Sequence, residues 1–479
     1  MKKIGLILII CIVLGGFCTC RFLYDNFSIK NYDLNNSANI PPKESLKRFS
    51  DGLKIKTISN SDYNKTDFEE FNKFINYIQT AYPDVFKKCE FKLINDYAIL
   101  LKLKGKTDNL PNIITAHYDV VGVKNDKNWK YSPFSGHFNN EYIYSRGTID
   151  DKGAVFAILE ALNELLKNNF IPDSDLYIAF SHCEETGSIE GAPKIIEYFK
   201  SKNIRFNSIL DEGGRIVDIN SKYFAFIGTS EKGRLLSKVT LYGIPSHASM
   251  PNNKTAVLKL AKLIQAFSKN DKKAFISKET EQYYKTTYKS HGLLTRFLIS
   301  NIDILKPLFI YKISKNPEDN ARIRTTFAIT IIEASNVQNA ISSDASLLID
   351  ARILPNETTQ DVKNYINEKI KKILPDEDYK IEYLSQIEPS LSKEANSLEF
   401  KKLSNVINKL YPNIPISPYL TLGGTDAREY AEISDNTFRF LPCILKPQDA
   451  SLMHSDNEKI SIENWSRMIN FYKEYMLEK

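Results

Sequence analysis

Histidine and carboxylate side chains follow several short apolar runs of the sequence. They are His117 and Asp119, the pairs Asp150–Asp151, Glu184–Glu185 and Asp211–Glu212, and His454. Two adjacent carboxylates repel each other, so a pair beside a buried strand is costly unless it is exposed or binds a cation. Exposure explains one such pair well, but it explains three pairs in similar positions poorly. The set offers enough nitrogen and oxygen ligands for two divalent metal ions, and zinc accepts this mixture.

Such a pair of metal ions would have a chemical use. Two metals about 3.5–4 Å apart can share one carboxylate and one water molecule. The leftover acid of the Glu184–Glu185 pair could then accept a proton from that water. The structural alternatives are helix capping by Asp150 or Asp151 and an ordinary structural role for His454.

The elements around these residues alternate between strands and helices, which is typical of an α/β domain. Apolar runs predict strands at 113–116, 176–180 and 208–210, and helical periodicity predicts a helix over 154–166. Ligands of open α/β sheets bind beyond the carboxyl ends of the strands. We therefore expect the histidines and acids that follow these strands to converge.

A second unit begins near Leu235. Its pattern predicts a strand around 239–241, a helix over 255–268, strands over 326–332 and 346–354, a helix over 358–374 and a strand over 379–383. This order is that of the split βαβ, ferredoxin-like sandwich. An insertion at about 270–322 carries the apolar segment 293–313, interrupted by Pro307. We expect it to form extra helices on the second unit; the alternative is an apolar wall for a substrate chain or a membrane surface.

The N-terminus resembles a targeting segment. Residues 4–17 form an uncharged apolar run after Lys2 and Lys3, and extension to Leu23 gives about 20 residues, enough to span a bilayer as a helix. We expect residues 1–23 to be an uncleaved anchor or a signal peptide, with the remainder exported. A buried N-terminal helix is the alternative. Residues 24–42, rich in Asn, Asp and Ser, read as a linker.

Composition excludes several classes of protein. The 479 residues are 42% hydrophobic and 25% charged, which fits neither a disordered chain nor a polytopic membrane protein. The net charge is +6, and no basic cluster with interleaved aromatic residues indicates a nucleic-acid partner. Outside the first 23 residues only Cys89, Cys183 and Cys443 remain, too scattered for a disulfide framework or a zinc finger. A metal must therefore be held by histidines and carboxylates.

Taken in order, these segments resemble the dizinc metallopeptidase family of carboxypeptidase S, aminoacylase, glutamate carboxypeptidase and the secreted N-acyl-amino-acid hydrolases. The likeness runs from about Leu46 to the C-terminus. The motifs Arg322–Thr326 and Asn339–Ile341 favour the carboxypeptidase S branch. The resemblance implies an α/β, zinc-peptidase-like catalytic domain with a mixed central sheet, in two parts at 43–234 and 388–479. An inserted ferredoxin-like α+β lid or dimerisation domain would occupy 235–387.

The resemblance also implies a role for each site residue. The implied ligands are His117 with Asp211 or Glu212 for one zinc, Glu185 and His454 for the other, and Asp150 between them, followed by a cis peptide. The implied catalytic residues are Asp119, behind the first ligand, Glu184 as general base, and His247, which stabilises the oxyanion, often from a partner subunit. The implied substrate contacts are Asn339 and Arg428, the latter to a free carboxylate. An ion pair between Arg428 and Asp426 or Glu429 is the alternative.

Together these residues imply a zinc-dependent hydrolase that cleaves an amide bond next to a free carboxylate with a metal-activated water. Two Zn²⁺ per chain are implied, with Co²⁺ or Mn²⁺ as alternatives. The substrate would be a peptide or an N-acyl amino acid, and a non-catalytic peptide-binding protein is the remaining alternative. We expect membrane contact through the N-terminal segment only, no nucleic acid, and a homodimer through the lid domain. Ser342 and Ser455 depart from the family pattern, which bears on local loop shape.

Overall fold

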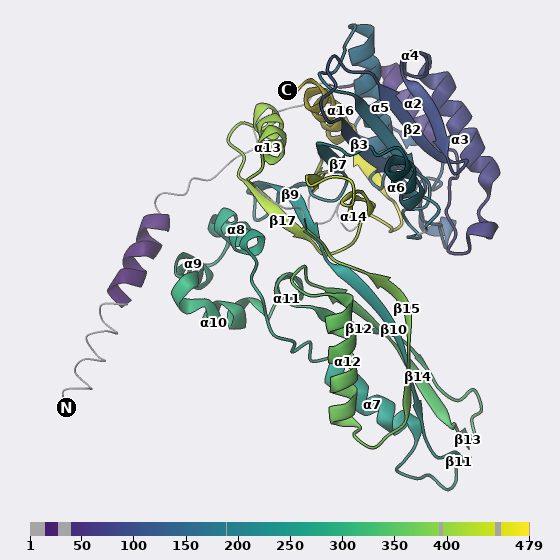
Figure 1. Cartoon of the computed structure of the whole chain (residues 1–479), viewed down its shortest axis with the longest axis vertical. Helices are drawn as coiled ribbons and strands as arrows, with labels where there is room; N and C mark the ends of the chain where they lie inside the picture. Colours follow the sequence, from purple (N-terminus) through teal and green to yellow (C-terminus); the bar gives the residue numbers. More distant parts are fainter. Residues whose placement is uncertain (1–14, 27–39, 188, 392–395, 446–451, 479) are drawn as a thin grey trace.

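The computed structural model describes residues 15–26, 40–187, 189–391, 396–445 and 452–478. A large mixed sheet with helices on both faces forms one end of the molecule, and a smaller four-stranded domain extends from it (Figure 1). Both units were predicted from the sequence, and so was the return of the chain to the large sheet after the small domain. The strand at Ser390–Leu391 (β16) already pairs with the large sheet.

The large sheet has eleven strands. They run in the order β1 (Glu90–Ile94), β2 (Ala98–Leu103), β6 (Leu176–Ser181), β3 (Asn112–His117), β7 (Ser208–Asp211), β18 (Thr437–Arg439), β9 (Tyr223–Glu231), β8 (Ile216–Asp218) and β19 (Ile444–Leu445), and β16 and β17 (Ile416–Thr421) also pair with β9. Strands β6, β3, β7 and β18 are parallel neighbours, whereas β1, β2 and β6 are antiparallel. The central strands are buried on both faces, which explains their continuous apolar runs.

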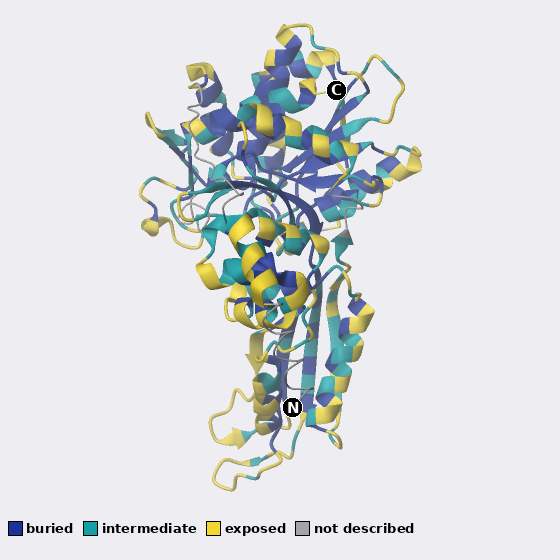
Figure 2. Cartoon of the chain, turned by 90° about the vertical axis from the view of Figure 1, so that its left-hand side faces the viewer, coloured by how far each residue is buried: buried dark blue, intermediate teal, exposed yellow. Residues whose placement is uncertain are grey.

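Helices cover both faces of this sheet. They are α2 (Lys43–Leu53), α3 (Phe68–Ala81), α4 (Pro83–Lys88), α5 (Lys152–Lys167), α6 (Ala192–Ser201), α13 (Leu398–Leu410), α14 (Ala427–Tyr430) and α16 (Ile462–Leu477), with short turns η1 (Tyr63–Lys65) and η2 (Asp126–Asn128). Almost every residue of α5 is buried, because α16 covers the side that α2 and α4 leave open. Phe49 of α2 stacks on Trp465 of α16 with ring centroids 4.7 Å apart. The buried core fills this end of the molecule (Figure 2).

The small domain has the ferredoxin-like order predicted from the sequence. Its elements are β10 (Gly233–Tyr242), α7 (Ala256–Phe267), β12 (Thr326–Glu333), β14 (Asp344–Ile353), α12 (Thr359–Ile373) and β15 (Tyr379–Ile387). The strand order is β12-β14-β10-β15, and every pair is antiparallel. Burial alternates along β10, so one face of the sheet packs on α7 and α12. Two short strands, β11 (Ser246–His247) and β13 (Ala340–Ile341), pair at the end far from the large sheet (Figure 1).

The insertion forms helices, as expected, and its first helix packs on the large sheet. Its helices are α8 (Lys278–Thr286), η3 (Tyr288–Ser290), α9 (Leu293–Ser300), α10 (Ile302–Ile313, which contains Pro307) and α11 (Pro317–Ile323). Tyr283 of α8 packs on Phe226 of β9 and Tyr419 of β17, with ring centroids 5.1 and 6.1 Å away. The insertion also contacts the small domain, where Asp271 pairs with Lys369 of α12 at 2.8 Å. The aromatic surface of the large sheet provides the contact for α8.

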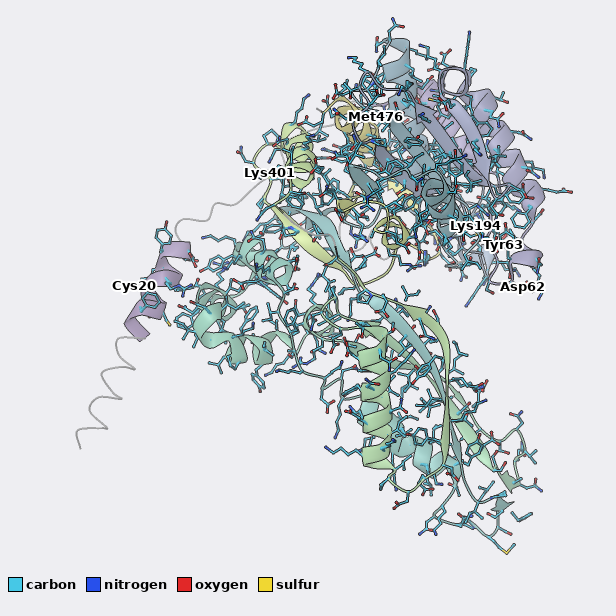
Figure 3. The ribbon with its side chains drawn as sticks, in the orientation of Figure 1. Cys20, Asp62, Tyr63, Lys194, Lys401 and Met476 are labelled. Carbon is cyan, nitrogen blue, oxygen red and sulfur yellow. The ribbon has the colours of Figure 1, made fainter. Side chains whose placement is uncertain are left out.

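A helix over residues 15–26 lies against this insertion. Arg21 forms an ion pair of 2.8 Å with Asp303, and Asn301 donates a hydrogen bond of 3.1 Å to the carbonyl oxygen of Cys18. Figure 3 labels Cys20 on the same helix. Residues 1–14 of the predicted anchor and 27–39 of the predicted linker lie outside the described residues. Within the described part of the chain, no helix combines the length and apolarity needed to cross a bilayer.

Candidate metal centre

Three parallel strands bring the predicted ligands to one edge of the large sheet. His117 is the last residue of β3, Glu184 and Glu185 follow β6, and Glu212 follows β7. Because the carboxyl ends of parallel strands meet at the same edge, these side chains converge as predicted. Nε2 of His117 lies 3.5 Å from Oε1 of Glu212 and 4.0 Å from Oε2 of Glu184.

Asp150 lies between two histidines. Its Oδ1 is 3.0 Å from Nε2 of His117, and its Oδ2 is 2.9 Å from Nε2 of His454. The same nitrogen of His454 is 3.0 Å from Oε2 of Glu185. One carboxylate thus joins a half-site of His117 and Glu212 to a half-site of His454 and Glu185.

Glu458 fixes the loops that carry Asp150 and His454. Its buried carboxylate pairs with Arg146 at 2.7 Å and accepts a hydrogen bond of 2.9 Å from the backbone N–H of Ile149. A small sheet of β4 (His137–Phe138), β5 (Tyr142–Tyr144) and β20 (Lys459–Ser461) joins the same two segments. The Asp150–Asp151 peptide is cis, as the resemblance implied. Glu458 was not predicted from the sequence, although it stands only four residues after His454.

Asp119 orients the residues around it. Its carboxylate lies 3.3 Å from Nδ1 of His117 and accepts hydrogen bonds from the backbone N–H groups of Glu184 (3.1 Å) and Glu185 (3.2 Å). Ser59 donates a further bond of 2.6 Å. Burial acts to raise the pKa of Asp119, but the bonds from His117 and its other donors lower it overall. Asp119 therefore stays charged, and it holds in place the ring of His117 and the turn that carries Glu184 and Glu185.

The cluster has more buried negative charge than the protein compensates. Burial raises the pKa of Glu212 to about 8, and the nearby charge of Asp150 adds to the effect. Burial likewise raises the pKa of Glu184. Among the described residues, Oε1 of Glu185 and both carboxylate oxygens of Asp151 are buried without a hydrogen-bond partner. Such groups are costly unless a cation satisfies them.

Two overlapping groups of ligand atoms fit metal ions. His117, Glu184 and Glu212 form one, and His117, Asp150 and Glu185 form the other, with all atoms of each group within 4.8 Å of one another. The thiols of Cys89, Cys183 and Cys443 belong to neither group. The donor set is thus imidazole and carboxylate, which suits zinc, manganese or cobalt.

The structure separates Asp211 from Glu212. Asp211 ends β7, and its Oδ1 accepts a hydrogen bond of 2.7 Å from the hydroxyl of Thr115 on the neighbouring strand. Glu212, one residue later, faces His117. The geometry therefore favours Glu212 as the ligand of the pair.

His247 and Asn339 lie apart from this cluster. Both are exposed at the far end of the small domain, where the N–H of Ala248 donates a hydrogen bond of 3.0 Å to the carbonyl oxygen of Asn339 (Figure 1). Nδ1 of His247 is 2.7 Å from the hydroxyl of Ser249. Within one chain, these two residues are not brought together with the predicted metal ligands.

Arg428 lies beside Gly424 and the turn that follows Glu184 and Glu185. A Cβ atom at Gly424 would lie 2.5 Å from Nη1 of Arg428, and one at Gly187 would lie 3.9 Å from Nη2. Nε of Arg428 pairs with Glu429 at 3.1 Å, so the internal ion pair expected as the alternative is present. Nη2 remains close to the turn that follows Glu185.

A cavity of about 700 Å³ opens from the cluster toward the insertion. Asp150, Glu184, Glu185, Glu212 and His454 line one part of it, and Phe226, Tyr283, Arg322 and Tyr419 line another. The sequence analysis did not predict the aromatic wall, because isolated tyrosines carry no motif. The wall exists because the insertion packs on β9 and β17.

Comparison with known proteins identifies the family of this chain. The model of "Peptidase family M20/M25/M40" matches residues 113–478, which include every residue of the cluster. The chain belongs to this family. It is therefore a hydrolase of a family that contains dinuclear metal-binding peptidases.

Two relatives represent two kinds of M20 protein. "Probable carboxypeptidase S-like 2" of Dictyostelium discoideum is 33% identical over 90% of this chain and 84% of the relative. "N-fatty-acyl-amino acid synthase/hydrolase PM20D1" of Xenopus tropicalis is 30% identical over 98% of this chain and 92% of the relative. The resemblance to the carboxypeptidase S and N-acyl-amino-acid hydrolase branch is confirmed.

Solved M20 structures share the fold. The metallo-carboxypeptidase Sso-CP2 of Sulfolobus solfataricus has a TM-score of 0.65 at 19% identity, covering 91% of this chain and 99% of its own. A dinuclear metal-binding M20 peptidase of Bacillus subtilis has a TM-score of 0.58 at 12% identity, covering 91% and 98%. The predicted α/β fold class is confirmed.

Proposed function

We propose that this M20 hydrolase binds two zinc ions and cleaves an amide bond next to a free carboxylate, in the manner of a carboxypeptidase. The observation that carries the proposal is the position of Asp150, whose two oxygens meet His117 and His454 at 3.0 and 2.9 Å. A carboxylate shared by two histidines suits the bridge of a dinuclear centre. Glu184 lies beside it in the same cavity.

The proposed ligands are His117 and Glu212 for one metal, Glu185 and His454 for the other, and Asp150 for both. When bound, the metals would polarise the scissile carbonyl and lower the pKa of a water molecule. Glu184 would accept the proton of that water and return it to the leaving amine, as one carboxyl group serves as base and then acid. Water adds across the amide, so the products are a carboxylic acid and an amine.

Glu184 is suited to this role by its surroundings. Its backbone is fixed by Asp119, and burial raises the pKa of its carboxyl group above the usual value. A base with a raised pKa binds a proton more strongly, which favours proton transfer from water near neutral pH.

We assign Arg428 to the free carboxylate of the substrate. A guanidinium group binds a carboxylate with two parallel hydrogen bonds. Its place beside Gly424 and Gly187 puts it near the acidic turn, and therefore near the scissile bond.

We assign Asn339 to the substrate and His247 to the oxyanion in a homodimer, with the end of one small domain reaching the cavity of the other subunit. The exposed Ile331 and Ile332 of the edge strand β12 support pairing between copies.

The acyl side of the substrate has two candidates. A peptide fits the carboxypeptidase S-like relative, whereas an N-acyl amino acid fits the PM20D1 relatives. Hydrolysis of N-acetyl-leucine, N-palmitoyl-leucine and alanyl-leucine, each with its C-terminal amide as control, separates the candidates. We expect cleavage of the free acids and at least tenfold slower cleavage of the amides. Equal rates on acids and amides would contradict the requirement for a free carboxylate.

We also infer that the chain is exported and attached to a membrane through its N-terminal segment. The apolar run at 4–17 leads into the helix over 15–26, which exposes Phe17 and Tyr24. Membranes of cells that express the full chain should retain it after alkaline extraction. Recovery in the soluble cell fraction would contradict this inference, and recovery in the medium would indicate cleavage.

A further inference from the structure

Arg322 of α11 is a buried cation in the wall of the catalytic cavity. Its side chain is only 5% exposed, and its Cζ lies 4.4 and 4.7 Å from the ring centroids of Tyr283 and Tyr419. Its Nε has no hydrogen-bond partner among the described residues. Its ion-pair partner is Glu318, whose side chain is 65% exposed. The charge of Arg322 is therefore removed from water without full compensation by the protein.

Arg324, which follows α11, has a structural role and provides a comparison for Arg322. Arg324 donates hydrogen bonds to the carbonyl oxygen of Lys272 (2.7 Å), the hydroxyl of Ser314 (2.7 Å) and the side chain of Asn320 (2.6 Å). These bonds tie together the two ends of the insertion. Arg322 makes no comparable set, and it lines the cavity.

Strand β17 and the loop after it line the cavity between Arg322 and the proposed metal centre. Tyr419 and Thr421 are two residues apart on β17, so both point to the same face, about 7 Å apart. Both line the cavity, and so do residues 422–425, which lead toward Asp426. Arg322, stacked on Tyr419, thus lines the same cavity as the acidic cluster.

A carboxylate is the group that best complements this site. Guanidinium binds carboxylates in a planar, paired geometry, and its delocalised charge tolerates the faces of two aromatic rings. The surrounding tyrosines exclude water, which strengthens the attraction. Glu318 is mostly exposed, so a substrate carboxylate can share or replace its contact at little cost.

We infer that Arg322 forms an anion-binding subsite for the acyl part of the substrate, so that preferred substrates carry a second carboxylate in that part. This inference rests on the proposed function, in which Arg428 holds the first carboxylate. The second carboxylate can belong to a dicarboxylic acyl group, as in N-succinyl amino acids, or to an acidic residue, as in Asp-Leu or Glu-Leu.

The test compares N-succinyl-leucine with its neutral isostere N-succinamoyl-leucine, and Glu-Leu with Gln-Leu, on the zinc-loaded full chain. We expect kcat/KM to be at least tenfold higher for the acid than for its neutral partner in one or both of these pairs. The pair that shows the preference identifies whether the second carboxylate belongs to a dicarboxylic acyl group or to an acidic residue. Arg322→Gln should bring that ratio close to one, and Arg322→Lys should keep part of it. Glu318→Gln should raise the ratio, because it removes the competing carboxylate.

Glu281→Gln is the matched control, since Glu281 is on α8 and pairs with Lys285 at the surface. It should leave the ratio unchanged. Ratios near one in the wild type for both pairs, or an equal loss on acid and neutral substrates in Arg322→Gln, would overturn the inference.

A binding measurement separates failure of the subsite from failure of the proposed function. Calorimetric titration of the zinc-loaded Glu184→Gln variant with the same matched pairs needs no turnover. Tighter binding of an acid than of its neutral partner, lost on addition of Arg322→Gln, supports the subsite even if the wild type hydrolyses neither. Equal binding of both partners overturns it even if hydrolysis proceeds. If Arg322→Gln fails to fold, the Glu318→Gln variant carries the same test, and an unchanged preference there counts against the subsite.

Discussion

Nε2 of His454 lies 2.9 Å from Oδ2 of Asp150, although the whole small domain separates the two residues in the sequence. The contact joins the first and second parts of the catalytic unit. Glu458 strengthens the junction through its buried ion pair with Arg146. The metal centre therefore forms only when both parts have folded together.

Glu184→Gln should lower kcat by at least about 10³-fold, because the amide cannot accept a proton while it preserves the shape of the side chain. The zinc content should stay at the wild-type level, since Glu184 is assigned as the base. Elemental analysis and steady-state kinetics on the same preparation measure both quantities. Glu164→Gln, on the exposed side of α5, serves as control. Activity within tenfold of wild type would remove Glu184 from the role of base.

Glu212→Gln and Asp211→Asn should separate the two acids that the sequence left unresolved. Glu212 faces His117, so its replacement should lower the zinc content from two ions toward one. Asp211 accepts a hydrogen bond from Thr115, so its replacement should leave two ions bound. Metal analysis after gel filtration compares the variants directly. Loss of zinc from Asp211→Asn alone would reverse the assignment.

His247→Ala should lower kcat by about 10²–10³-fold, the usual effect of losing an oxyanion donor. If His247 acts in the partner's cavity, a mixture of His247→Ala and Glu184→Gln chains should regain about one quarter of wild-type activity. Random pairing makes half of the dimers mixed, and one of the two cavities in each mixed dimer is complete. Refolding or exchange of the two inactive variants provides the measurement. An inactive mixture that contains mixed dimers would contradict action across subunits.

His291 should make the free energy of unfolding fall in acid. Burial lowers the pKa of His291 to about 4, with help from the charge of Arg296, whereas the unfolded chain titrates near 6.5. Between these values the unfolded state binds more protons, so the free energy of unfolding decreases by as much as about 3 kcal/mol as the pH falls from 6.5 to 4. His291→Gln should lack this part of the decrease. Denaturant unfolding of both proteins at pH 6.5 and 4.5 tests the difference, and parallel pH profiles would refute it.

The positions of His117, Asp150, Glu184 and His454 could be predicted because residue type, strand ends and motif order all agreed. The choice between Asp211 and Glu212 could not, because strand side chains alternate and a shift of one residue in the end of β7 reverses the two. The order of elements in the small domain was predictable because its strands and helices each carry a regular hydrophobic pattern. Its helices begin at strong caps, Thr255 and Thr358.

The surface on which the insertion packs could not be predicted from its sequence. An apolar helix packs on any complementary surface, and the partner surface here is formed by Phe226 and Tyr419, which are distant in sequence. The cavity role of Arg322 depends on this packing. His247 likewise carries no information on which subunit it serves, because that depends on a second chain.

The metal content of the purified protein tests the central claim most directly. We expect two zinc ions per chain by elemental analysis, loss of amide hydrolysis on treatment with a chelator, and recovery when zinc is restored. Cobalt or manganese should restore activity to a different level, which identifies the metal that supports the highest rate. Full hydrolysis by metal-free protein would contradict a metal-dependent mechanism. Absence of both bound metal and hydrolysis would favour a non-catalytic peptide-binding protein.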